Sequence, residues 1–108
     1  MIEAMERSYV ERQAARVSGV LAHCHADRLV DTLSRLPILR LPVLVTSGER
    51  DIQVPQRYGR AVARAIPGAR FHLFEGPQAS HCSCFELADE FNRVVLDFTR
   101  EAEAVAWA

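Results

Sequence analysis

Asp51 and His81 have the side chains of a catalytic acid and base. They also follow one another in an order that a catalytic site can use. Asp51 follows a short apolar run from Pro42 to Val45 that is broken at Gly48. His81 comes after a further helix-like stretch and a second apolar run. Strand, acid, helix, strand and histidine is a succession in which the acid and base of a Ser-His-Asp triad are laid out. The nucleophile should come earlier, and none is found in this sequence.

The composition restricts the class of protein. The chain has 108 residues, of which 49% are apolar and 25% charged, as in one globular domain or part of one. Its thirteen basic and fourteen acidic residues are interspersed, so no nucleic-acid partner is expected. No run is long enough to span a membrane, and the first residues lack the form of a signal peptide. We therefore expect a cytoplasmic protein without a membrane partner, whose three cysteines are free thiols.

The N-terminal third has helical periodicity. Residues 2 to about 17 carry apolar side chains at helical spacing among charged ones. Ser18-Gly19 predicts a break in this pattern. A second helix is expected from about Val20 to Leu36, ending there because Pro37 disfavours a helical conformation in the residue before it.

From Pro42 the pattern predicts alternating strands and helices. Val43 to Val45 is a short β-branched run typical of a strand buried in a parallel sheet. A helix from Gln56 to Ile66, a strand from Phe71 to Phe74 and a long helix from Phe85 to about Ala104 follow. This order implies a right-handed parallel crossover. Two parallel strands need further strands and covered faces, so the segment is expected to associate with more sheet.

Residues 37 to 100 resemble the C-terminal portion of the α/β-hydrolase superfamily. The matching positions are Pro37-Ile38, Leu41 to Val45, Gly48-Glu49-Arg50-Asp51, Val54-Pro55, Ala65 to Ala69, Glu75-Gly76, His81, Glu86, Phe91 and Leu96-Asp97-Phe98. No single piece is specific, whereas the ordered set is. The resemblance implies an α/β fold, a partial α/β-hydrolase with two parallel strands and flanking helices, preceded by cap-like helices. It divides the chain into a cap-like segment, 1–36, and a C-terminal hydrolase segment, 37–108.

The resemblance also implies an activity and its residues. Asp51 would be the acid and His81 the base of a triad that hydrolyses a small-molecule ester, thioester, amide or lactone. A carboxylate bonded to the imidazole fixes its tautomer and stabilises the imidazolium that forms. No cofactor and no metal are expected.

The nucleophile elbow of this family, Gly-x-Ser-x-Gly, does not occur, because the five glycines never have that spacing. No oxyanion-hole motif is found either. The family's order places both before residue 1. Three explanations stay open: a subunit of a split hydrolase, a fragment or truncated gene product, or a degenerate relative that serves as an interaction module. We favour the truncated or split form, and expect a homo-oligomer or a complementary hydrolase chain as partner.

Each candidate residue also has a purely structural interpretation. Asp51 is of a type that caps the helix after it, and His81 is also compatible with a surface loop ahead of a helix whose N-cap is Ser83. His72 lies within a predicted strand, where a packed side chain is expected rather than a catalyst.

Two His/Cys clusters suggest other chemistry. His23-Cys24-His25 and His81-Cys82-Ser83-Cys84 contain zinc-type ligands, but the spacing is tighter than that of structural zinc sites. We therefore expect cysteines that fill small apolar spaces. Cys82 or Cys84 as a thiol nucleophile beside His81 is a minor alternative.

The arginines around the second half of the chain are numerous. Arg57, Arg60 and Arg64 share one predicted helix, and Arg70 follows it. They suggest attraction of an anionic substrate, although a charged outer face is the simpler interpretation.

Overall fold

The computed structural model describes residues 3–4, 7 and 17–106, which fall into two compact units. The first unit comprises Met1–Asp31 and the second Thr32–Ala108. The second unit contains the sheet and both residues proposed for catalysis.

The first unit contains helix α2 (Val17–Leu29), whose residues are exposed. This helix continues through Ser18 and Gly19, so the predicted break is wrong. Most of the helix predicted over residues 2–17 lies outside the described residues.

The helix predicted up to Leu36 is also wrong in its second half. The α-helix ends at Leu29, and a 3₁₀ helix, η1 (Leu33–Ile38), follows in the second unit. Val30, Asp31 and Thr32 separate the two, and aspartate and threonine are unfavourable in helix interiors. Pro37 lies inside η1 rather than ending an α-helix.

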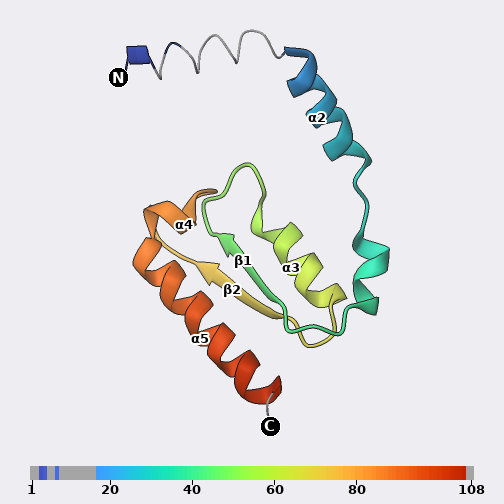
Figure 1. The fold of residues 1–108 in the computed structure, drawn as a ribbon, viewed down its shortest axis with the longest axis vertical. Coiled ribbons are helices and arrows are strands. Elements are labelled where there is room, and N and C mark those ends of the chain that lie inside the picture. The colour runs from blue at the N-terminus through green and yellow to red at the C-terminus, as the bar shows by residue number, and fades with distance from the viewer. Residues whose placement is uncertain (1–2, 5–6, 8–16, 107–108) are drawn as a thin grey trace. The chain divides into compact units, whose positions relative to one another are not determined.

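The sheet has two parallel strands, β1 (Leu44–Gly48) and β2 (Arg70–Phe74), as predicted (Figure 1). The register pairs Leu44 with Arg70 and Gly48 with Phe74. β1 extends beyond the predicted apolar run because pairing with β2 continues through three more residues. Its side chains are half-buried along most of its length, rather than buried on both faces.

One helix lies on each side of the sheet (Figure 1). α3 (Gln56–Ala65) begins directly after Pro55, which suits the start of a helix. α5 (Ala88–Ala106) packs through Phe91, whose ring centroid lies 5.8 Å from that of Phe74. Among the residues described here, no helix has the length and apolar character needed to cross a membrane.

The helix predicted from Phe85 is divided in two. A single turn, α4 (Ser83–Glu86), comes before α5. Leu87 separates them, with φ −121° and ψ 43°, outside the helical range. The prediction was therefore wrong at the N-terminal end of this helix, just after the loop that carries His81.

The fully buried apolar core within the described residues is small. It comprises Ile66, Phe74 and Ala79, while large apolar side chains elsewhere are exposed, Leu41 and Ile52 among them. A parallel sheet is stable when both faces and edges are covered. The described part of the chain therefore leaves apolar surface for further contacts.

Gly48 allows a close approach of two backbone segments in this unit. A Cβ at this position would lie 2.4 Å from the carbonyl oxygens of both Ala79 and Ser80. Backbone atoms cannot move aside as a side-chain tip can. The loop before His81 therefore requires glycine at the end of β1.

We expect Gly48→Ala to lower the free energy of unfolding by about 1–3 kcal/mol, the usual cost of overpacking. Urea denaturation followed by circular dichroism measures it. Gly59→Ala is the matched control, because its Cβ would meet mainly the Ser47 hydroxyl, which is able to rotate away, and alanine favours the helix. Equal stability of Gly48→Ala and wild type would contradict the close approach.

Candidate functional site

Asp51 is held in the loop directly after β1. Its backbone N–H donates to the Gly48 carbonyl at 3.2 Å, which turns the chain off the strand. Its Oδ1 accepts hydrogen bonds from the N–H groups of Gln53 at 2.9 Å and Val54 at 2.8 Å. The side chain is only 9% exposed. The carboxylate is thus held by hydrogen bonds from the local backbone, independently of its contact with His81.

The loop that carries His81 is tied to the loop after β1. The Arg50 N–H donates to the Ala79 carbonyl at 2.9 Å, and the Gly76 N–H donates to Glu49 Oε2 at 2.9 Å. Gly76 has φ 100°, a conformation that favours glycine. These bonds hold the chain just before His81 against the loop after β1.

Asp51 and His81 meet at hydrogen-bond distance. His81 Nδ1 lies 2.9 Å from Asp51 Oδ2, and the imidazole is 45% exposed. Since Nδ1 is taken by the carboxylate, Nε2 is the nitrogen available for a proton from a nucleophile. The structure brings together the two residues that the sequence analysis singled out.

The surroundings of Asp51 favour its ionised form. Burial acts to raise the pKa of the carboxyl, but the N–H of Val54, the hydrogen bond from His81, the N–H of Gln53 and the charge of His81 together outweigh it. The pKa of Asp51 therefore lies below its ordinary value of 3.8. A carboxylate that stays ionised is able to orient and stabilise an imidazolium.

A hollow of about 350 Å³ contains both side chains. Besides Asp51 and His81 it is lined by Thr46, Ser47, Gly48, Val54, Phe74, Ser80, Ser83, Cys84 and Phe91. The hollow combines apolar walls with the polar pair, as small-molecule sites do.

Sequence analysis missed the polar contacts that hold the loop around His81. Ser80 Oγ forms a hydrogen bond with Glu86 and accepts one from the Cys82 N–H at 3.2 Å. Ser83 was wrongly predicted as an N-cap: Cys82 has that position, and Ser83 Oγ donates to the Ser80 carbonyl at 2.7 Å. Two serines and a glutamate closely flanking the histidine were the available signal.

His72 does not line the hollow that Asp51 and His81 share. His72 packs against Phe74 with ring centroids 4.7 Å apart, and its Nε2 lies 3.8 Å from Glu90 Oε1. His23 lies 3.6 Å from Asp27 on exposed α2. Within the described ranges, no three His, Cys, Asp or Glu side chains are arranged to hold a metal ion.

The three cysteines are free and exposed. Cys84 lines the hollow that contains His81, whereas Cys24 lies on α2. Cys84 therefore shares the hollow with His81, and its role as a nucleophile stays a hypothesis.

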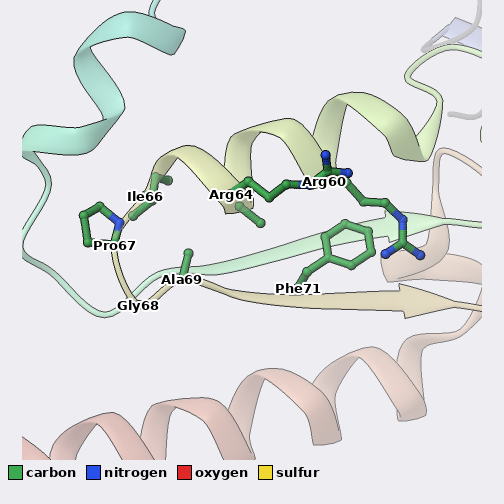
Figure 2. A pocket seen from close by; sticks show the side chains of 8 residues that line it. Arg60, Arg64, Ile66, Pro67, Gly68, Ala69 and Phe71 are labelled. Atoms are coloured by element: carbon green, nitrogen blue, oxygen red, sulfur yellow. The ribbon is translucent and has the colours of Figure 1, made fainter.

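Arg60 and Arg64 of α3 line a different hollow, of about 440 Å³, at the C-terminal end of that helix (Figure 2). Arg60 lies over the Phe71 ring at 4.5 Å and its Nε donates to Gln56 Oε1 at 2.9 Å. Arg70 is paired with Glu101. Neither Asp51 nor His81 lines this hollow. The geometry thus favours charged outer-face roles over attraction of substrate to the His–Asp pair.

Known proteins share sequence similarity with part of this chain. No protein-family model matches the sequence. The chain is 38% identical over 63 residues to serine hydrolase BPHL of Mus musculus, covering 58% of this chain and 21% of that protein. It is 33% identical over 95 residues to 2-hydroxy-6-oxononadienedioate/2-hydroxy-6-oxononatrienedioate hydrolase 2 of Pseudomonas putida, covering 77% and 32%.

The fold agrees with a solved structure. The enol-lactonase from Burkholderia xenovorans LB400 superposes with a TM-score of 0.70 and 33% identity, over 91% of this chain and 39% of the enol-lactonase. The chain therefore spans well under half the length of the proteins that it matches. Similarity to part of an α/β-hydrolase superfamily protein is thereby confirmed in sequence and in fold.

The hydrogen bond between His81 and Asp51 predicts which nitrogen of the neutral imidazole carries the proton. When neutral, His81 is expected to carry its proton on Nδ1, because Nδ1 faces a carboxylate that only accepts. In Asp51→Asn the amide N–H₂ is able to face Nδ1 instead, which moves the proton to Nε2. Long-range ¹H–¹⁵N correlation spectra of the imidazole measure the tautomer in wild type and in Asp51→Asn, and Asp27→Asn is the control. The same tautomer in wild type and Asp51→Asn would contradict the pairing.

The lowered pKa of Asp51 makes stability depend on pH. Because the folded pKa lies below the ordinary value of 3.8 that applies to the unfolded chain, the carboxylate stabilises the fold above about pH 4. This contribution is lost as the pH falls through the folded pKa. We therefore expect Asp51→Asn to be less stable than wild type at pH 7, with the difference shrinking towards pH 3 in urea denaturation series.

The control for this series is Asp27→Asn, which removes an exposed carboxylate paired at a distance with His23. Exposed pairs contribute little, so its difference from wild type should be small throughout. A difference for Asp51→Asn that is constant with pH would show that the carboxylate charge is not what stabilises the loop.

Proposed function

We propose that Asp51 and His81 are the acid and base of a Ser-His-Asp hydrolase site, which a segment carrying the nucleophile completes. The observation that carries this proposal is the 2.9 Å contact between His81 Nδ1 and Asp51 Oδ2, inside a hollow and at the end of a parallel sheet. The similarity to hydrolases over this part of the chain supports it.

The proposed reaction proceeds through an acyl-enzyme. His81 Nε2 takes the proton of the serine hydroxyl as its oxygen attacks the substrate carbonyl carbon. The imidazolium then gives this proton to the leaving group as the bond to the carbonyl carbon breaks. Water attacks the acyl-enzyme in the same way and releases the acid and the free serine. Asp51 stays ionised throughout and stabilises the imidazolium.

The bond hydrolysed is an ester, thioester, amide or lactone of a small molecule. An enol-lactonase is among the similar proteins, which supports a lactone as the first substrate to test. The hollow of about 350 Å³ suits an acyl group of modest size.

A second candidate function is a non-catalytic interaction module. Exposed apolar side chains such as Ile38, Leu41 and Phe85 favour it, because such surface commonly marks association. In that case the bond between Asp51 and His81 only stabilises the loops.

The test is a chimera in which this chain replaces the matching stretch of the Burkholderia enol-lactonase. We expect lactone hydrolysis that falls by a factor on the order of 10³ or more in His81→Gln, because the general base is lost. His23→Gln, in the exposed pair with Asp27, is the matched control and should keep full turnover. Initial rates with an enol-lactone measure the activity of the chimera and of its two variants.

A folded chimera without activity, or with activity unaffected by His81→Gln, would favour the interaction module. The 108-residue chain is expected to show negligible turnover without the nucleophile segment. Robust hydrolysis of an activated ester by the chain, abolished in His81→Gln, would place a nucleophile within it instead.

A further inference from the structure

The hollow at the C-terminal end of α3 is separate from the hollow that contains Asp51 and His81, because no residue lines both. Its volume of about 440 Å³ lies in the range of small-molecule pockets. Arg60 and Arg64 are four residues apart, which places them on the same face of the helix. Figure 2 shows both side chains extending from α3, with the Phe71 ring between this helix and β2. Two guanidinium groups therefore border one hollow.

The Arg60 guanidinium is held in place while most of its donors stay unused. Its Cζ lies 4.5 Å from the centroid of the Phe71 ring, and its Nε donates to Gln56 Oε1 at 2.9 Å. Among the described residues, the terminal nitrogens Nη1 and Nη2 have no hydrogen-bond partner. These two nitrogens form a fork that binds oxyanions through two parallel hydrogen bonds. The group is thus oriented by the protein and available to a ligand.

No carboxylate in the described part of the chain neutralises the two charges at this hollow. Arg70 is paired with Glu101, and Arg100 Nη1 lies 3.8 Å from Asp97 Oδ1. Arg60 and Arg64 have no such ion pair within the described ranges, and no acidic residue lines the hollow. The C-terminal end of a helix carries a partial negative charge of about half a unit, which two full positive charges exceed. The hollow therefore attracts anions.

The rest of the lining is apolar and leaves room for the body of a ligand. Ala63, Ile66 and Pro67 contribute carbon atoms, and Ile66 is 4% exposed. A Cβ at Gly68, which has a φ of 74°, would meet no atom within 4 Å, so the turn is open at this point. Charged groups beside apolar walls suit a ligand that joins an oxyanion to an apolar group.

We propose that this hollow binds a phosphate monoester with a small apolar group. A phosphate monoester carries a charge of about −1.5 to −2 at pH 7 and has three strong acceptor oxygens. Two guanidinium groups are able to share these oxygens, whereas a single bidentate guanidinium already occupies both oxygens of a carboxylate. The apolar group would lie against Ala63 and Pro67. This inference does not depend on the proposed hydrolase activity.

Titration of the ¹⁵N-labelled 108-residue chain with phenyl phosphate, at constant ionic strength, tests the site. The backbone amide and arginine Nε–H signals report where the ligand binds. Saturable shifts are expected at Arg60, Arg64 and Gly68, with the backbone signal of His81 unchanged. His81→Gln should bind phenyl phosphate with the same Kd as wild type, whatever its effect on hydrolysis. Absence of saturable shifts at the two arginines would overturn the inference.

Three matched substitutions in α3 identify the groups that bind. Arg60→Gln and Arg64→Gln are each expected to raise the Kd for phenyl phosphate by about tenfold or more, because charge-assisted hydrogen bonds are lost. Arg57→Gln removes the same charge from the same helix outside the hollow, so its Kd should change by less than about twofold. Far-UV circular dichroism checks that each variant is folded. Equal effects of all three would show general attraction by the helix and overturn the site.

Two further probes separate the phosphate group from the apolar group. Inorganic phosphate is expected to shift the same arginine signals with a higher Kd than phenyl phosphate, because it lacks the apolar contacts. An equal Kd would assign the hollow to free phosphate and overturn the monoester. Benzyl alcohol, which has an apolar ring and no charge, is expected to leave the arginine signals unchanged. Binding of benzyl alcohol as tight as that of phenyl phosphate would overturn the anion site.

Discussion

Parallel pairing of β1 with β2 places the carboxyl ends of both strands at the same end of the sheet, and the geometry of the site depends on this. Asp51 follows one strand and His81 comes after the other, so their loops meet although a helix separates them in sequence. With antiparallel pairing, the two loops would lie at opposite ends. Parallel pairing requires a long connection between the two strands, and the crossover helix α3 supplies it.

The loops meet closely because glycine ends β1. The Ala79 and Ser80 carbonyl oxygens lie only 2.4 Å from the position that a Cβ of residue 48 would take, and the Ala79 carbonyl accepts a hydrogen bond from the Arg50 N–H. This backbone contact holds the His81 loop over the Asp51 loop without a large apolar core. The side-chain bond between Asp51 and His81 then adds to a geometry that the backbone already defines.

The small core and the open edge of β1 have a common consequence. Ile66, Phe74 and Ala79 are buried in the described part of the chain, while many large apolar side chains are not. A parallel sheet of two strands leaves polar backbone groups and apolar faces without partners. The stability of this unit is therefore expected to rise when these groups and faces are covered.

The sequence was sufficient to predict the elements with strong local signals. Pro55 and Pro67-Gly68 bound α3, and the apolar run at Phe71 to Phe74 marks β2, because proline, glycine and β-forming residues act on the backbone locally. The order of acid, helix, strand and histidine also singled out Asp51 and His81. Tertiary structure alone decided the end of β1, the division of the last helix at Leu87 and the contacts of Ser80, Ser83 and Glu86. These depend on which segments lie side by side, and a linear pattern does not contain that information.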